Sequence, residues 1–296
     1  MLERKRIIRT FLERGILLSP EELAKINENN YTEFLEKHEK KGRPEPGKEK
    51  SKTTVTSGKP AEKITVDDFI KNHTENYEFL KGILLKKTDA VSINKGRKIF
   101  HEVSIIGRAK EVAEREFILE DVTGETRVVP DRKEPVSEGD VIALVGFFKE
   151  NSFFPKSILW PDIPLDKTPE KIEGIKIVLS SKPIEDKDRL VINHDDGLPN
   201  PRQVSLERNG KNMTILLFRP AEKINDQNAT KILKSRAIGK DATPGNIIRQ
   251  VPAVFWVVDN DENWTRNYRG VVIISTDRES FAEYDTSSNE VVFGKI

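Results

Sequence analysis

HEVSIIGRAKEVAEREFILEDVTGETRVVP, residues 101–130, is the stretch that decides the fold of this chain's first well-patterned region. Its short apolar-rich runs stop at turn signals such as Asp121-Val122-Thr123-Gly124, which is typical of short β-strands. GDVIALVGFFKENSFFPKSILWPDIP, residues 139–164, continues the same pattern. Four or five short strands in a segment of this length have the size of an OB-fold barrel. The sequence therefore predicts a small closed sheet here.

The barrel segment is flanked by a helix and by a second region of strands. Thr65-Val66-Asp67-Asp68 predicts the start of a helix that carries apolar residues from Phe69 to Leu84. From residue 174 onward, six apolar runs predict strands: GIKIVLSS, RLVINHDD, MTILLF, PAVFWVV, RGVVIIST and EVVFGK. Several of them are continuously apolar, as expected of strands buried on both faces. With one helical segment at 229–239, they predict an α/β or α+β sandwich that is short for its class.

The chain before residue 63 differs in composition from the rest. Apolar residues at helical spacing predict a small helical module, with a capping-box start at Ser19-Pro20-Glu21-Glu22. Residues 39–62 are dominated by Lys, Glu, Pro, Gly, Ser and Thr, which predicts a flexible linker. We therefore expect an α+β multidomain protein with a helical module (1–38), a linker (39–62), a helix plus OB-fold domain (63–165) and a sandwich (166–296).

Composition excludes several classes of protein. The chain has 296 residues, 33% of them charged, and a net charge of +1, so a nucleic-acid-binding surface would have to be local. It has no cysteine, which excludes disulfides, thiolate ligands and a cysteine nucleophile. No run approaches the roughly 18 apolar residues of a membrane span, and the start lacks a signal-peptide pattern. We expect a soluble, cytoplasmic protein without a membrane partner.

The order of helical module, linker, OB barrel and phosphoesterase-like sheet resembles the small subunit of archaeal D-family DNA polymerase. The resemblance covers most of the chain and is strongest at 63–165 and 229–275. The matching stretches are FLERGILLSPEEL (11–23), DAVSINKG (89–96), EVSIIGRAKEV (102–112), LEDVTGET (119–126), SILWPDIP (157–164), ATKILKSRAI (229–238) and VPAVFWVVDNDENWTRNYRGVVIIST (251–276). None of these stretches is diagnostic alone, but their number and order make the match specific.

The resemblance implies a calcineurin-like phosphoesterase domain with a two-metal site that removes nucleotides from a 3′ end. Such sites bind two metal ions through Asp, Asn and several His side chains. Asn193-His194-Asp195 fits the expected Gly-Asn-His-Asp loop, with Ile192 in place of Gly. The other three expected motifs are replaced. Ser180-Ser181 stands for Asp-x-His, Arg219-Pro220 for His-Gly, and Asp259-Asn260-Asp261-Glu262 for Gly-His-x-His.

The C-terminal region contains too few histidines for an intact two-metal site. The chain has four histidines, and His194 alone lies beyond residue 165, where such a site would be built. The segment between the first strand and Asn193 is also too short for the usual ligand-bearing strand–helix unit. We therefore interpret Asn193, His194 and Asp195 as a remnant and expect no intrinsic cofactor. An oxygen-only site for Mg²⁺ or Mn²⁺ that uses Asn193, Asp195, Asp259 and Asp261 remains the alternative.

Direct contact with DNA is a second possibility. OB folds bind single strands with aromatic stacking platforms beside a positive groove. The candidates are Arg108, Lys110, Arg127, Lys149, Phe153 and Trp160 in the barrel, and Lys231, Lys234 and Arg236 in the late helix. The alternative for the aromatic residues is burial in the core, and for the helix it is a solvated face. In the family that this chain resembles, the barrel is chiefly an interface element.

The sequence therefore predicts a non-catalytic small subunit of a D-family replicative DNA polymerase. Its expected partners are the large catalytic subunit, DNA and, through the N-terminal module, other replication proteins at the nucleoid. Two alternatives stay open. One is an active metal-dependent 3′–5′ exonuclease subunit, and the other is a stand-alone OB-fold protein that binds single-stranded DNA.

Overall fold

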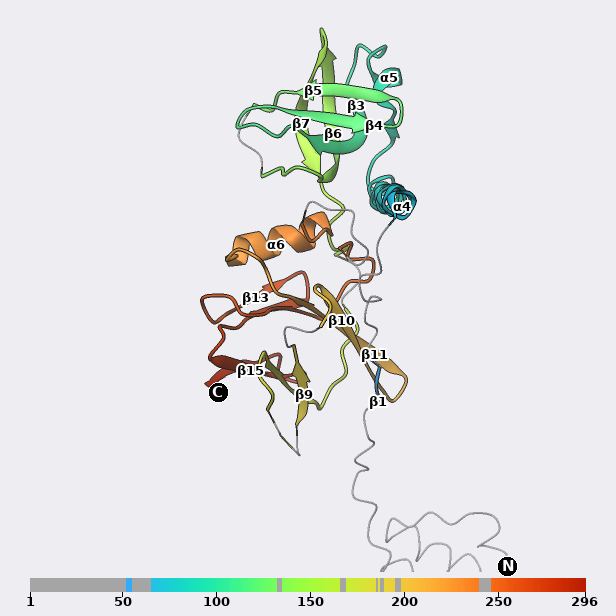
Figure 1. The fold of residues 1–296 in the computed structure, drawn as a ribbon. Coiled ribbons are helices and arrows are strands. Elements are labelled where there is room, and N and C mark those ends of the chain that lie inside the picture. The colour runs from blue at the N-terminus through green and yellow to red at the C-terminus, as the bar shows by residue number, and fades with distance from the viewer. Residues whose placement is uncertain are drawn as a thin grey trace, which may run out of the picture. The chain divides into compact units, whose positions relative to one another are not determined.

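The barrel is built from five strands that follow one another around a closed ring (Figure 1). They are β3 (Val103–Lys110), β4 (Phe117–Asp121), β5 (Gly124–Val128), β6 (Val141–Lys149) and β7 (Ser152–Leu159). The order is β3-β4-β5-β7-β6, and β6 pairs back to β3. The pair β5–β7 is parallel, whereas the other pairs in the ring are antiparallel. The predicted small closed sheet of OB type is present.

The computed structural model describes residues 52–54 (backbone only), 65–131, 135–165, 169–184, 186, 189–194, 198–239 and 246–296. Within this part the protein is mostly β-structure, with few helices and three mixed sheets. Residues Ser51–Ile296 belong to one compact unit. The predicted helical module 1–38 and most of the predicted linker 39–62 lie outside the described residues. In the described part, no helix is long and apolar enough to span a membrane.

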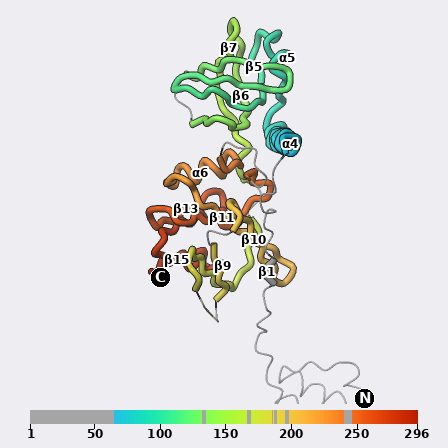
Figure 2. Tube along the Cα trace, viewed as in Figure 1, coloured from blue at the N-terminus to red at the C-terminus, as the bar shows by residue number. Residues whose placement is uncertain are grey.

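The barrel interior follows from alternation along its strands. The residues that alternate inward are almost completely buried, and they include Ile105, Leu119, Val128, Leu144 and Phe153. The tube in Figure 2 follows β5, β6 and β7 around this core. Short elements border the barrel: β2 (Ala90–Val91), which pairs in parallel with β3, and α5 (Ile93–Gly96).

Gly146 of β6 leaves no room for a side chain against the backbone of β7. A Cβ atom at this position would lie 2.1 Å from the backbone oxygen of Phe154 and 2.9 Å from the Cα of Pro155. The pairing register also shifts between Val145 and Gly146. We expect Gly146→Ala to lower the free energy of unfolding by about 2 kcal/mol, because the β7 backbone must move away. Urea denaturation measures this loss, and Gly82→Ala, at a position with open space, is the control.

Helix α4 (Val66–Leu84) confirms the predicted helix start. Thr65 is the N-cap, and its hydroxyl accepts a hydrogen bond from the Asp68 backbone amide while the Asp68 carboxylate accepts one from the Thr65 amide. This reciprocal pair satisfies two backbone donors that a helix start would otherwise leave free. The second half of α4 buries Tyr77, Leu80 and Leu84 against Ile106, Val141 and Ala143 of the barrel.

The second region contains two sheets and one helix. The six-stranded sheet has the order β1-β10-β11-β12-β14-β13, and the four-stranded sheet has the order β16-β15-β8-β9. Their bounds are β1 (Lys52–Thr54), β8 (Lys176–Ser180), β9 (Leu190–Asn193), β10 (Arg202–Arg208), β11 (Lys211–Phe218), β12 (Val254–Val257), β13 (Trp264–Tyr268), β14 (Val271–Ser275), β15 (Ser280–Asp285) and β16 (Val291–Lys295), with α6 at Asp226–Ser235.

These elements stack in three layers, with α6 on one face of the six-stranded sheet and the four-stranded sheet on the other (Figure 1). Between the sheets, Leu179 and Tyr284 pack with Trp256 and Ile274. On the opposite face, Phe255 and Ile273 pack with α6. All residues of β12 and β14 are buried, which confirms the prediction from their continuous apolar runs.

Three parts of this region differ from the expectation. The strands β10, β13 and β15 were not predicted, because polar residues outnumber apolar ones in β10 and β13 and interrupt the apolar residues of β15. Helix α6 ends at Ser235, so Arg236 does not lie on a helix face; its φ of 56° ends the helix in the left-handed region. Lys52–Thr54, within the predicted flexible linker, forms β1 and pairs with the edge of β10. The β-branched Thr53 and Thr54 favour such extended pairing.

The connection between β8 and β9 is unusually short. The two strands are parallel neighbours joined by residues 181–189. Parallel neighbours ordinarily need a crossover of about a dozen residues or more, which is often a helix. The short segment between the first strand and Asn193 that the sequence showed is therefore the direct connection between two neighbouring strands of one sheet.

Candidate functional site

The candidate site lies where the carboxyl ends of parallel strands from both sheets meet. β8 is parallel to β9, and β11, β12 and β14 are parallel to one another. Each of these strands ends in polar residues. These residues are Ser180, Asn193 with His194, Arg219, Asp259 and Thr276. We refer to this set as the strand-end edge.

Arg219 connects the two sheets at the strand-end edge. Its Nη2 donates a hydrogen bond of 2.8 Å to the backbone oxygen of His194, which follows β9 of the four-stranded sheet. Its Nε lies 2.9 Å from Oδ2 of Asp259, which follows β12 of the six-stranded sheet. Asn200 holds the Arg219 backbone on both sides, because it accepts from the amide (2.8 Å) and donates to the carbonyl (2.6 Å). The guanidinium is thus fixed between the predicted ligand positions.

Asp259 is the carboxylate that this arginine neutralises. Its side chain is 8% exposed and that of Arg219 is 19% exposed, so most of the pair is shielded from water. A second cation, Arg278, lies 3.8 Å from the same oxygen but is 77% exposed. A buried carboxylate requires such a partner, because an isolated charge in the interior is very costly.

The neighbouring residues of the same loop do not converge on Asp259. Asp261 pairs with Lys223 at the surface. Asn260 is buried; its amide donates to the Ile224 carbonyl (2.7 Å) and to the Ser275 hydroxyl (3.0 Å), which fixes the loop. Asp195 lies outside the described residues. The structure therefore links the His194 backbone and Asp259 through Arg219, and places Asp261 in a separate surface ion pair.

This donor set does not fit a pair of divalent metal ions. A two-metal centre needs several carboxylate and imidazole ligands that face an open position. Here the Asp259 carboxylate faces the permanent positive charge of Arg219, and Ser180 uses its hydroxyl to donate to the Lys182 carbonyl (2.7 Å). Among the described residues, no group of three or more His, Asp or Glu side chains could hold a metal. The charged groups of the strand-end edge, Arg219 and Asp259, therefore neutralise each other as an internal ion pair.

The predicted DNA-binding residues do not form one surface. In the barrel, Phe153 is fully buried and Trp160 is 5% exposed, so their rings are not available for base stacking. Lys110 pairs with Glu120 (2.5 Å), and Arg127 pairs with Glu116. Lys149 is exposed at the end of β6.

Arg108 is directed at α4 rather than at solvent. It donates to the His73 carbonyl (3.2 Å) and lies 5.8 Å from the Tyr77 ring centre, and burial lowers its pKa. Arg108 therefore helps to hold α4 on the barrel.

The predicted basic residues of the late helix face the barrel. Lys231 lies 3.4 Å from the Asp140 carboxylate, and Lys234 lies 5.2 Å from the ring centre of Trp160. Burial raises the pKa of Asp140, and Lys231 opposes this effect. Arg236 is buried, with its guanidinium 5.9 Å from the Phe79 ring and its pKa lowered by burial. Contacts inside the protein therefore occupy these three residues.

Asp162, in the segment that leaves the barrel, is a hub that the sequence did not reveal. It is 6% exposed, and its carboxylate accepts a hydrogen bond from the Tyr268 hydroxyl (2.9 Å) and an ion pair from Arg269 (2.9 Å). Its backbone amide donates to the Lys234 carbonyl (2.8 Å). Desolvation and the Asp162 charge together raise the pKa of Tyr268 to about 12. Asp162 thus joins the segment that leaves the barrel to β13 and α6. The sequence offered one signal for this position, because SILWPDIP contains an Asp, a residue type that tolerates φ > 0.

The chain, with its OB-type barrel and two-sheet sandwich, is similar in part to known proteins. No protein-family model matches it. A DNA polymerase II small subunit from Archaeoglobus fulgidus is 31% identical over 134 residues, which are 42% of this chain and 28% of that relative. The chain is therefore related to the small subunit of archaeal DNA polymerase II, and it matches less than two thirds of that relative's length. The solved structure of the hypothetical protein ygiW from E. coli covers 24% of this chain and 89% of its own, at 14% identity and a TM-score of 0.21.

Proposed function

We propose that the chain is a non-catalytic small subunit of an archaeal D-family DNA polymerase, whose calcineurin-like domain is shortened and has lost its 3′–5′ exonuclease site. The relation to a DNA polymerase II small subunit supports the assignment to this complex. The large catalytic subunit and DNA would be its partners. The N-terminal module 1–38 would reach other replication proteins at the nucleoid.

One observation carries the non-catalytic part of this proposal, namely the Arg219–Asp259 pair. A guanidinium stays protonated at any physiological pH, so Arg219 keeps its positive charge beside Asp259 and cannot lose a proton to make room for a metal ion. A metal at Asp259 would have to displace a shielded ion pair and would then lie beside a fixed positive charge. Within the part of the chain that the structure describes, this pair supports the loss of a metal-bound hydroxide as nucleophile.

The Asp162 hub supports a role in positioning. A platform must hold its parts in one geometry, and buried, hydrogen-bonded ion pairs favour a single arrangement over others. Lys87 adds to the same segment, because its ammonium donates to the carbonyl oxygens of Trp160 (2.9 Å) and Pro161 (2.6 Å). The barrel and the sandwich would act together as the docking unit for the large subunit.

The first test is hydrolysis of a 3′-labelled oligonucleotide by the purified chain. With Mg²⁺ or Mn²⁺ present we expect no release of nucleotides, and we expect EDTA to leave the melting temperature unchanged, since a bound metal would stabilise the folded state. Manganese-dependent hydrolysis that His194→Ala abolishes would instead establish the active exonuclease.

The second test is assembly. Coexpression with the large polymerase subunit of the same organism should give a complex that survives gel filtration, and the large subunit should bind primed DNA more tightly in that complex. If no complex forms, and the chain alone binds single-stranded oligonucleotides with a steep salt dependence, the stand-alone DNA-binding alternative is correct.

A further inference from the structure

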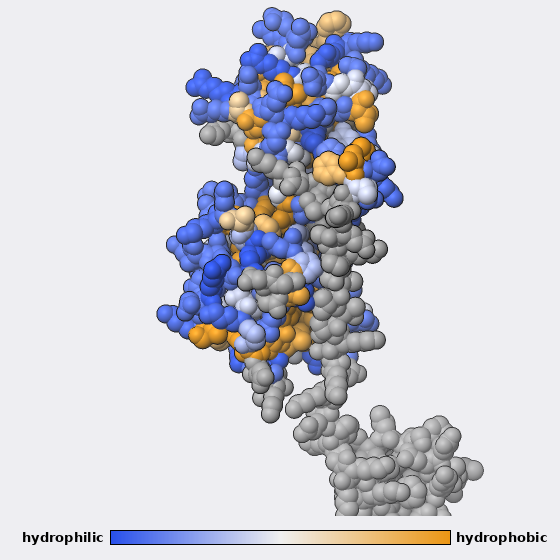
Figure 3. Space-filling model, in the orientation of Figure 1, coloured by the Kyte–Doolittle hydropathy of each residue, from blue (hydrophilic) through white to orange (hydrophobic). Residues whose placement is uncertain are grey.

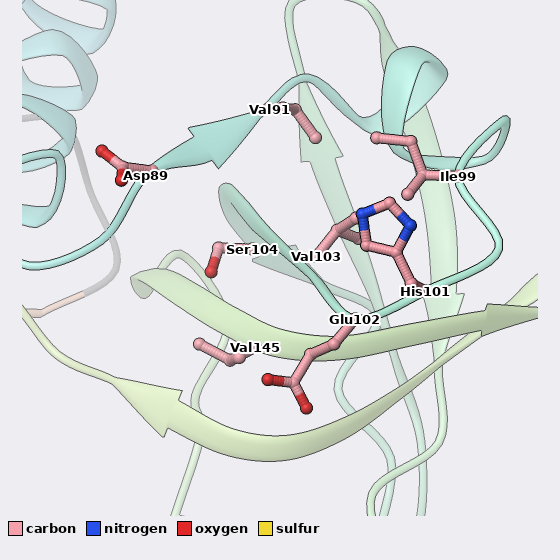
Figure 4. Close-up of a pocket in the computed structure, with 8 residues that line it drawn as sticks. All are labelled: Asp89, Val91, Ile99, His101, Glu102, Val103, Ser104 and Val145. Atoms are coloured by element: carbon pink, nitrogen blue, oxygen red, sulfur yellow. The ribbon is translucent and has the colours of Figure 1, made fainter.

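A pocket of about 260 Å³ lies on the barrel where β2, the start of β3 and β6 meet (Figure 4). Half of its lining residues are apolar, namely Val91, Ile99, Val103 and Val145. Its polar groups are two carboxylates (Asp89 and Glu102), the His101 imidazole and the Ser104 hydroxyl. It is separate from the strand-end edge. Pockets for small-molecule ligands usually have volumes of about 300–1,000 Å³, so the size suits a single side chain better than a cofactor.

The neighbourhood of this pocket already holds a cation. Lys156 of β7 lies 2.6 Å from the Glu102 carboxylate and 5.5 Å from the ring centre of Phe147. Both members of this ion pair are about half exposed, so the pair contributes little stability and can exchange for another. A carboxylate beside an aromatic face is a favourable environment for a guanidinium, which can pair with the first and stack on the second.

Two exposed aromatic residues belong to the same part of the barrel: Phe100 is 100% exposed and Phe147 is 39% exposed. On the face of the molecule seen in Figure 3, hydrophobic patches are scattered among hydrophilic residues. Phe100 directly precedes the pocket residue His101, and Phe147 follows Val145 on the same face of β6. An exposed Phe ring forgoes the free energy that its burial would contribute. A bound chain segment would recover part of it.

We propose that this pocket binds an arginine side chain of a protein partner, with the flanking residues of that segment packing on Phe100 and Phe147. The aliphatic side chains of the lining take the methylene stem of the arginine, and the Glu102 carboxylate, beside the Phe147 ring, takes the guanidinium. A nucleic-acid strand fits less well, because its phosphates would face two carboxylates. This inference is independent of the proposed function; it specifies a recognition chemistry for any partner, the large polymerase subunit included.

The test uses NMR of the full chain with the peptide acetyl-Leu-Arg-Leu-amide. The chain has four histidines, so the ring signal of His101 is assigned by comparison with His101→Gln. We expect the His101 signal to shift saturably with the arginine peptide, and about tenfold weaker binding of the same peptide with citrulline, the uncharged isostere of arginine. Glu102→Gln should weaken binding about fivefold, as loss of one charge-assisted hydrogen bond predicts.

The controls separate binding from damage to the fold. Glu222→Gln, an exposed position in the second region, should leave the affinity unchanged, and the signals of His73 and His194 should not move in any variant. The proposal is overturned if the arginine peptide leaves His101 unshifted, or if the citrulline peptide binds equally well. It is also overturned if oligo(dT) shifts His101 and Glu102→Gln strengthens that effect, which would identify a nucleic-acid site.

Discussion

Arg219→Ala should lower the free energy of unfolding by about 3–4 kcal/mol, because it leaves the carboxylate of Asp259 buried and without its main partner. It also removes the hydrogen bond to the His194 carbonyl, which links the two sheets. Arg219→Lys should recover part of the loss, since it keeps the charge but cannot contact both groups with one planar fork. Urea denaturation followed by far-UV circular dichroism measures each value.

The double variant Arg219→Ala/Asp259→Asn isolates the ion pair. Asn tolerates the positive φ of position 259 (55°), so it removes the charge without backbone strain. If the buried charge causes the loss, the double variant should be more stable than Arg219→Ala alone. Arg278→Ala, which removes the exposed and more distant cation, should cost less than about 0.5 kcal/mol. Equal effects of the two single arginine variants would show that Asp259 reaches solvent and that the pair is not the centre of the edge.

Local sequence patterns predicted the barrel, the helix with a complete cap and the continuously apolar strands. The barrel followed from alternation and turn signals, and α4 from the Thr65 capping box, because these determinants lie within a few residues of one another. The strands β12 and β14 followed from continuous apolar runs for the same reason. β13 escaped prediction because it lies at the sheet edge, where polar residues are tolerated and no apolar pattern is required.

The candidate site could be predicted only in part, because its partners are distant in sequence. The resemblance named Asn193, His194 and Asp259 as remnants of a metal site, and in the structure Arg219 contacts the His194 backbone and the Asp259 carboxylate. That Arg219 would neutralise Asp259 depends on the packing of the two sheets. Likewise, the basic pattern of α6 indicated a DNA-binding face, but Lys231 and Lys234 have partners in Asp140 and Trp160 that no local pattern reveals. A run of basic residues indicates that the side chains need partners, but which groups become those partners depends on the tertiary fold.

Asp162→Ala should lower the free energy of unfolding by about 3 kcal/mol and separate the unfolding of the barrel from that of the sandwich. The substitution leaves the Tyr268 hydroxyl and the Arg269 guanidinium without their shared acceptor. It also places Ala at a φ of 54°, which Asp tolerates better. Hydrogen exchange monitored on peptides from β3 and from β12 should then give two different opening free energies.

Asp162→Asn is the matched variant, because it keeps an oxygen that accepts from Tyr268 and removes the negative charge. We expect it to lose less stability than Asp162→Ala and to lower the pKa of Tyr268 from about 12, since the Asp162 charge contributes to that elevation after desolvation. Ultraviolet titration of the tyrosines measures the shift, and Asp131→Ala, at an exposed position, should change neither quantity. An unchanged pKa of Tyr268 would mean that burial alone raises it. The barrel exit would then be held by packing rather than by charge, and a platform built on Asp162 would have no basis.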